Sequence, residues 1–135
     1  MAFIEWEEKY NLNIKEVDDQ HQHLMDLLNK LYDSVVSGAE RTVLGETLDD
    51  LIQYTVEHFQ TEEDLFETFQ YPHAESHRKE HNDLTRAVIE LQEQFKEGSA
   101  TISFEVLDFL RNWLIDHTLG SDQKFGPYFN QKGIF

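Results

Sequence analysis

The sequence predicts an all-α fold, an up-down-up-down four-helix bundle with an N-terminal extended arm and a short C-terminal tail. Apolar residues recur at helical spacing over four long segments, and no strand-like alternation competes with them. The 135 residues contain only two Pro and six Gly, which leaves room for long helices. Short connections between the segments favour antiparallel neighbours. The length predicts a single domain that covers residues 1–135.

The N-terminal arm and the first helix differ in their apolar pattern. Residues 1–17 have no clear period but many apolar side chains, so we expect an extended arm on the outside of the fold. The first helix should begin near Asp18 or Asp19, either of which can cap, and end at Gly38. Its inward face is predicted to carry His21, Leu24, Leu28, Leu31 and Val35.

The second and third helices meet near Pro72. The second should run from about Arg41 to Gln70, and the third from about His73 to Glu97, closed by Gly98-Ser99. The inward face of the second carries Leu44, Leu48, Leu51, Thr55, His58, Glu62, Phe66 and Phe69. That of the third carries His77, His81, Leu84, Val88, Leu91 and Phe95.

The fourth helix should begin near Thr101 and stop at Gly120. A short tail with a turn at Gly126-Pro127 is expected to follow. The inward face of this helix is predicted to carry Phe104, Leu107, Leu110, Trp113, Leu114 and His117.

Polar side chains interrupt these apolar faces. His58 and Glu62 are four residues apart and share one face, where a carboxylate without a partner would be costly to bury. In an antiparallel bundle, the inward polar residues of all four helices fall toward the same end. One such histidine is usually a satisfied core residue, but five with a carboxylate indicate a metal site. The five are His21, His58, His77, His81 and His117.

Two positions need a further argument. Asp122 follows His117 by five residues, about 140° off its face on a continuous helix; a helix end at Gly120 would let its carboxylate turn back into the bundle. His73, His77 and His81 are spaced so that either adjacent pair could ligate, and the first-turn position of His73 favours the other two. Other acidic residues lie off the inward faces and are expected to be solvated, namely Glu57, Glu63, Asp64, Glu80 and Asp116.

Composition restricts the chemistry. Without cysteine, any metal must be held by imidazole and carboxylate, which suit iron, zinc, manganese or copper. The net charge of -16 disfavours binding to nucleic acid and anionic membranes. No apolar run approaches the ~20 residues of a membrane span. The N-terminus carries Glu5, Glu7 and Glu8 and does not resemble a signal peptide, so we expect a cytoplasmic protein.

The number and kind of the ligands indicate a pair of ions. Five imidazoles and two carboxylates exceed the needs of one ion and suit two ions bridged by the carboxylates. Bundle sites for oxidative di-iron chemistry use mostly Glu, whereas this set is rich in neutral imidazole. That composition disfavours highly oxidised iron and favours reversible ligand binding over oxygenase chemistry.

The order of these residues resembles the hemerythrins, in particular the bacterial single-domain bacteriohemerythrins. The resemblance covers essentially the whole chain. It rests on His21, His58-x-x-x-Glu62, His77-x-x-x-His81 and His117-x-x-x-x-Asp122, with Val17–His21, His58–Glu63, Tyr71-Pro72, Trp113-Leu114, Trp6 and Tyr10. It implies two iron ions, cycling between Fe2+ and Fe3+, with an oxo or hydroxo bridge. One iron would take His77, His81 and His117 and the other His21 and His58, with Glu62 and Asp122 bridging both.

The resemblance also implies an O2 pocket lined by Leu24, Phe59, Trp113, Leu114 and Thr118. The family usually has Ile where this chain has Thr118. We expect the Thr118 hydroxyl to bond back to the carbonyl of Trp113 or Leu114, with its methyl toward the pocket. The alternative is a hydroxyl that faces the pocket and promotes oxidation of the site.

The function implied is reversible O2 binding for storage, delivery or scavenging, without enzymatic turnover. An O2 or redox sensor is one alternative, and a di-iron enzyme that acts on peroxide or nitric oxide is another. O2 is then the expected partner. The apolar C-terminal segment, residues 125–135, could also dock on an oxygen-using enzyme.

Overall fold

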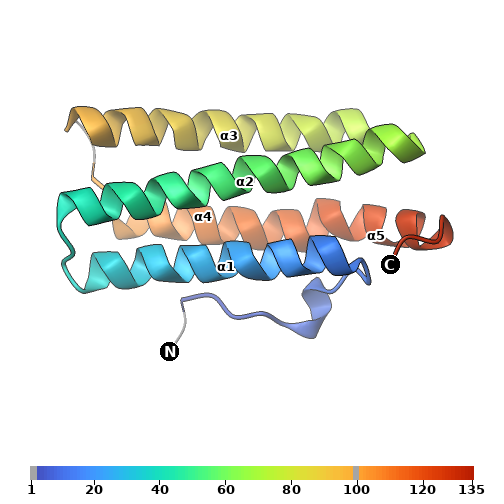
Figure 1. Ribbon diagram of the computed structural model, residues 1–135, viewed down its shortest axis with the longest axis horizontal. Coiled ribbons are helices and arrows are strands. Elements are labelled where there is room, and N and C mark those ends of the chain that lie inside the picture. The colour runs from blue at the N-terminus through green and yellow to red at the C-terminus, as the bar shows by residue number, and fades with distance from the viewer. Residues whose placement is uncertain (1–2, 99–100) are drawn as a thin grey trace.

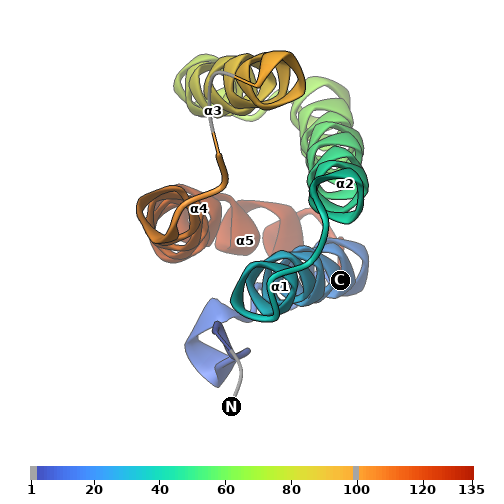
Figure 2. The same cartoon turned by 90° about the vertical axis from the view of Figure 1, so that its left-hand side faces the viewer.

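The computed structural model describes residues 3–98 and 101–135. Within these residues every regular element is a helix, and four long helices lie antiparallel around a common centre (Figures 1 and 2). They are α1 (Lys15–Val36), α2 (Arg41–Phe69), α3 (Ala74–Glu97) and α4 (Phe104–Asp116). The predicted fold class is confirmed. No helix in this part of the chain is long and apolar enough to cross a bilayer.

The first helix begins about one turn earlier than the sequence suggested. α1 starts at Lys15, and Asp18 does not cap it. Instead, the Asp18 carboxylate accepts backbone N–H bonds from Leu12 (2.9 Å) and Ile14 (3.3 Å). Asp18 therefore ties the arm to the helix that follows it.

The predicted ends of the other helices are close to those observed. α2 ends at Phe69, with Gln70 in the left-handed region (φ 53°), and α3 ends at Glu97, with Gly98 in the same region (φ 84°). Ser99 lies outside the described residues. α4 begins after Ser103, whose side chain accepts the Val106 N–H at 3.2 Å, slightly later than expected. Phe104 is 57% exposed, so its inward assignment was wrong.

The predicted stop at Gly120 was also wrong. The chain continues through η2 (His117–Ser121), a single π-helical turn, into α5 (Asp122–Gln131). The Asp122 N–H bonds to the His117 carbonyl, the i+5 to i bond that defines such a turn.

The expected turn at Gly126-Pro127 is part of α5. Proline normally disfavours helical backbone at the preceding residue, partly through a clash with its Cβ, which Gly126 lacks. A Cβ at Gly126 would also meet the side chain and carbonyl of Leu12 at 3.4 Å. Glycine at this position therefore serves both the helix and the packing of the arm.

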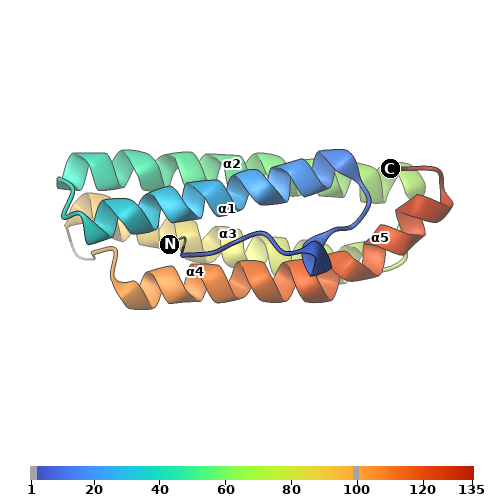
Figure 3. The same ribbon diagram turned by 90° about the horizontal axis from the view of Figure 1, so that it is seen from below.

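The arm lies across α1 and α4, as Figure 3 shows, and contains the short helix η1 (Glu8–Tyr10). The backbone of Ile4 exchanges two 2.8 Å hydrogen bonds with the Asn29 side chain of α1. The Phe3 ring stacks on Tyr32 of α1 with centroids 4.3 Å apart, and Arg111 of α4 packs on the same ring. The arm is more than an outer cover, because Ile4 and Tyr10 are buried.

The buried apolar residues form two separate clusters. The larger cluster, the bundle core, fills the space between the four long helices and includes Leu28, Leu31, Leu84 and Leu107. The smaller cluster, called the plug below, joins the arm, the end of α2 and α5. It consists of Leu12, Ile14, Val17, Phe66, Tyr71, Phe125 and Phe129.

Candidate metal centre

Five imidazoles and two carboxylates converge between the bundle core and the plug. Each of the seven side chains is buried, and Glu62 and Asp122 are completely so. The group consists of His21 from α1, His58 and Glu62 from α2, His77 and His81 from α3, His117 from η2 and Asp122 from α5. The structure thus brings together every residue predicted as a ligand. His23 and His73 are exposed and lie outside the group.

Glu62 lies between two sets of histidines. Its Oε1 atom is 3.0 Å from His77 Nε2 and 3.1 Å from His81 Nε2. Its Oε2 atom is 3.2 Å from His21 Nε2 and 2.6 Å from His58 Nε2. Each carboxylate oxygen therefore faces a different pair of imidazoles.

Asp122 repeats this division from the opposite side. Its Oδ2 atom is 3.0 Å from His21 Nε2, whereas its Oδ1 atom is 2.9 Å from His77 Nε2 and 3.0 Å from His117 Nε2. The π turn makes this possible, because the wider turn rotates Asp122 toward the face of His117. The sequence had predicted that a helix end at Gly120 turns Asp122 inward, whereas the π turn does so in the structure.

Hydrogen bonds pair only some of the ligand atoms, for example His21 and His77 with Glu62. Among the described residues, neither oxygen of Asp122 nor His58 Nε2 has a hydrogen-bond partner, although all three atoms are buried. His81 Nε2 and His117 Nε2 face each other at 3.2 Å. Buried polar atoms without partners are costly, and lone pairs that converge on common points fit bound cations. The donors form two groups, each with its ligand atoms within 4.8 Å of one another.

Without metal, the two buried carboxylates raise the pKa values of several of the histidines. Burial alone would lower the pKa of His21, but the carboxylates of Asp122 and Glu62 outweigh it and raise that pKa to about 9. Burial opposes charge on His117 too, yet Asp122 and Glu62 hold its pKa well above the usual value. A metal must therefore displace protons from this cluster when it binds.

Three further side chains contact the rear nitrogens of the histidines. Gln20 Oε1 accepts from His58 Nδ1 at 2.7 Å, Glu63 lies 3.4 Å from His81 Nδ1, and Glu80 lies 3.3 Å from His117 Nδ1. Glu63 and Glu80 are partly buried, so the prediction that they are solvated was wrong. The bond from His117 lowers the pKa of Glu80 to about 2.

The sequence contained a signal for these three residues. Gln20 precedes His21, Glu63 follows Glu62, and Glu80 precedes His81. A residue adjacent to an inward ligand points about 100° away around the helix. From there it can reach behind a ligand of the next helix.

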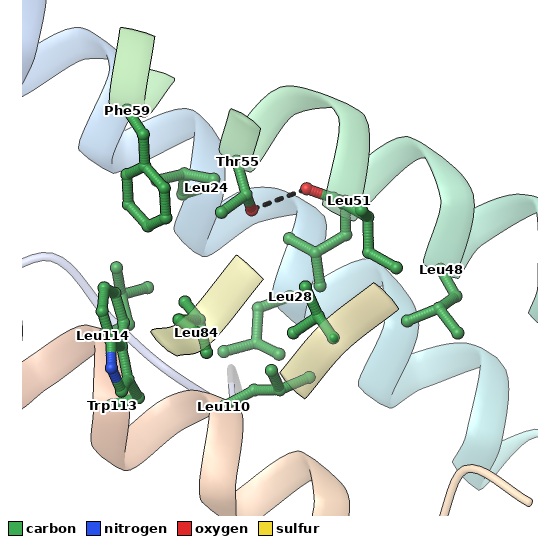
Figure 4. A pocket seen from close by; sticks show the side chains of 12 residues that line it. Leu24, Leu28, Leu48, Leu51, Thr55, Phe59, Leu84, Leu110, Trp113 and Leu114 are labelled. Carbon is green, nitrogen blue, oxygen red and sulfur yellow. Dashed lines mark hydrogen bonds between the residues drawn. The ribbon is translucent and has the colours of Figure 1, made fainter. Parts of the chain in front are cut away.

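An apolar cavity of about 40 Å³ adjoins the cluster within the bundle core. The Phe59 ring stacks on His81 with centroids 3.8 Å apart, and the Trp113 ring stacks on His117 at 4.4 Å. Figure 4 shows Phe59, Trp113 and Leu114 at one end of the cavity and Leu48 at the other. The wall consists of Leu24, Leu28, Leu48, Leu51, Ile52, Thr55, Phe59, Leu84, Val88, Leu110, Trp113 and Leu114.

Four of the five residues predicted for an O2 pocket line this cavity, and Thr118 does not. Thr118 is completely buried, but its hydroxyl has no hydrogen-bond partner in the described part of the chain. The predicted bond back to Trp113 or Leu114 was therefore wrong. Both of these carbonyls accept the N–H of His117 instead.

The fold and the cluster together define a metal-binding protein of the four-helix-bundle class. Residues 12–129 match the family described as Hemerythrin HHE cation binding domain. This chain belongs to the hemerythrin family, as its motifs had suggested.

Relatives of known name agree with this assignment. The chain is 34% identical over 128 residues to the bacteriohemerythrin of Methylococcus capsulatus. The matched region covers 94% of this chain and 97% of the relative. It is 34% identical to that of Stenotrophomonas maltophilia, over 93% of this chain and 80% of the relative. The crystal structure of a wild-type hemerythrin superposes with a TM-score of 0.90 at 34% identity, covering 93% of this chain and 97% of that one.

Proposed function

We propose that this protein binds O2 reversibly at a pair of iron ions. The observation that carries the proposal is the arrangement of the two carboxylates. Glu62 and Asp122 each direct one oxygen toward each of the two sets of histidines. Such carboxylates are suited to bridge two ions. His77, His81 and His117 would hold one ion, and His21 and His58 the other.

The unequal number of imidazoles supports binding of a small ligand. An ion held by His21 and His58 would have two imidazoles instead of three, which would leave a coordination position for the ligand. A pair of ferrous ions bound by these residues would supply the electrons that reversible O2 binding requires. The set has only two carboxylates among seven donors, and this low anionic charge favours release over oxidative turnover.

The residues of the cavity would give the ligand an apolar space beside the site. Leu24, Phe59, Trp113 and Leu114 offer apolar surface directly beside the cluster. The stacking of Phe59 on His81 and of Trp113 on His117 holds those imidazole rings in place and excludes water. A small, apolar molecule is the ligand that such a space admits most readily.

The deciding experiment is a visible spectrum of the iron-loaded protein as O2 is removed and readmitted. We expect a charge-transfer band that appears only with O2 and returns over several cycles, with two irons per chain. Sustained consumption of peroxide or nitric oxide would instead favour the enzyme alternative.

Histidine variants supply the matched comparison. His117→Ala should lose iron from one half of the site and abolish the band, whereas His73→Ala, which changes an exposed histidine on the same side of the bundle, should do neither. Loss of iron in His73→Ala but not in His117→Ala would contradict the assignment of ligands.

A further inference from the structure

The rear partners of the histidines follow a consistent order around the bundle. Gln20 of α1 serves His58 of α2, Glu63 of α2 serves His81 of α3, and Glu80 of α3 serves His117 of η2. Each helix therefore supports a ligand on the next one. At the remaining interface, His21 Nδ1 is buried and has no partner among the described residues.

The chemistry of these partners differs between the two halves of the site. Two of the three histidines in the His77, His81 and His117 half are backed by carboxylates. In the other half, His58 is backed by the neutral amide of Gln20. The orientation of that amide is set by its NH2 group, which donates to the Thr61 hydroxyl at 3.2 Å, so its oxygen faces His58.

A carboxylate behind a ligated imidazole has two effects. It fixes the ring with Nε2 toward the metal, and it increases the electron density that Nε2 offers. A neutral amide fixes the ring but adds less charge. Glu80 should have the stronger influence of the two carboxylates, because Arg78 lies 3.5 Å from Glu63 and offsets part of its charge. Ser121 also donates to Glu80 and holds it in place.

We propose that Glu80, assisted by Glu63, is a positioning residue that makes the His77, His81 and His117 half the tighter metal site. Gln20 leaves the His21 and His58 half the more labile one. The inference rests on the proposed two-metal site and concerns its internal asymmetry. The metal of the labile half then leaves first and enters last.

Metal loss to a chelator tests this directly. The protein is loaded with two equivalents of Co2+, mixed with excess EDTA, and followed by the visible absorption of bound cobalt. We expect two phases, one for each half of the site. Glu80→Gln should accelerate the slow phase by about ten-fold or more and leave the fast phase unchanged. Gln20→Glu should slow the fast phase.

Two controls separate positioning from a general effect. Glu93→Gln removes the same charge from an exposed position on α3 and should change neither phase. The metal-free variants should match the parent in circular dichroism, which shows that the helices are unchanged. A parent that holds no cobalt or iron would overturn the proposed function and this inference together. Two ions released at rates that neither Glu80→Gln nor Gln20→Glu alters would overturn the inference alone.

Discussion

The two apolar regions on either side of the polar cluster are built differently. The plug is largely aromatic, and Phe125 and Phe66 pack edge-on against His77 with centroids 5.5 and 4.8 Å away. The bundle core is mainly aliphatic and contains the cavity beside Phe59 and Trp113. Rigid rings thus close the site toward the end of the bundle, while the interior of the bundle leaves space. The site is covered by aromatic rings on one side and borders an apolar cavity on the other.

Removal of a plug ring should have the largest effect. Phe125→Ala deletes a completely buried side chain and should lower the free energy of unfolding by about 3–5 kcal/mol. It should also speed metal loss, because water gains access to His77. Urea unfolding of the metal-loaded protein measures the first effect. Phe135→Ala, at a residue 74% exposed, is the control and should stay within about 0.5 kcal/mol.

The polar cluster between the two regions should make the stability of the metal-free protein depend on pH. The pKa of His21 in the folded protein is about 9, above its usual 6.5. Its protonation therefore stabilises the fold fully below pH 6.5, and this stabilisation is lost as the pH rises through about 9. The thermal midpoint of the metal-free protein should therefore fall over that interval, by roughly several degrees. The metal-loaded form should not show this fall, because metal already requires neutral imidazole. A metal-free midpoint that rises over the same interval would contradict the proposed charge balance.

The space in the bundle core predicts tolerance of a larger side chain. Leu84→Phe enlarges a residue at the cavity wall and should cost less than about 1 kcal/mol, because the void accepts part of the ring. Leu31→Phe changes a completely buried leucine away from the cavity and should cost about 1–3 kcal/mol. Leu84→Phe should also slow O2 association in rapid mixing. Equal costs for the two variants would argue against usable space in the cavity.

The smallest effect concerns Thr118. Thr118→Val replaces its unpaired hydroxyl by a methyl group of similar size and should stabilise the protein by about 1 kcal/mol. Thr55→Val is the control, because the Thr55 hydroxyl donates to the Leu51 carbonyl at 2.7 Å and its loss should not stabilise. Thermal unfolding of both variants without metal measures the difference. Destabilisation by Thr118→Val would mean that a buried water satisfies this hydroxyl.

The long helices and the inward histidines could be predicted because helical period directly determines which residues share a face. This rule placed His21, His58, His77, His81 and Glu62 on inward faces, where the structure has them buried. Asp122 was assigned for the wrong reason, since the 140° mismatch with His117 reflected a wider turn and not a helix end. The sequence pattern predicts which residues point inward, but it does not predict the backbone hydrogen bonds that orient them.

Other features depended on contacts that the sequence does not display. Asp18 looked like a helix cap, but its role follows from the path of the arm, which has no period to read. Glu63 and Glu80 lie at the edges of their helices, where most carboxylates are solvated. Only the position of the neighbouring helix shows that their oxygens reach His81 and His117.

The π turn in η2 acts as a phase shift in the final helix. One extra residue within a turn rotates everything downstream by about 100° relative to the preceding segment. The residues that face inward afterwards are Asp122, Phe125, Gly126 and Phe129, so the same rotation delivers both a carboxylate to the cluster and two rings to the plug. One turn therefore sets the positions of both the Asp122 carboxylate and the plug rings, and an insertion or deletion in this turn would misplace both at once.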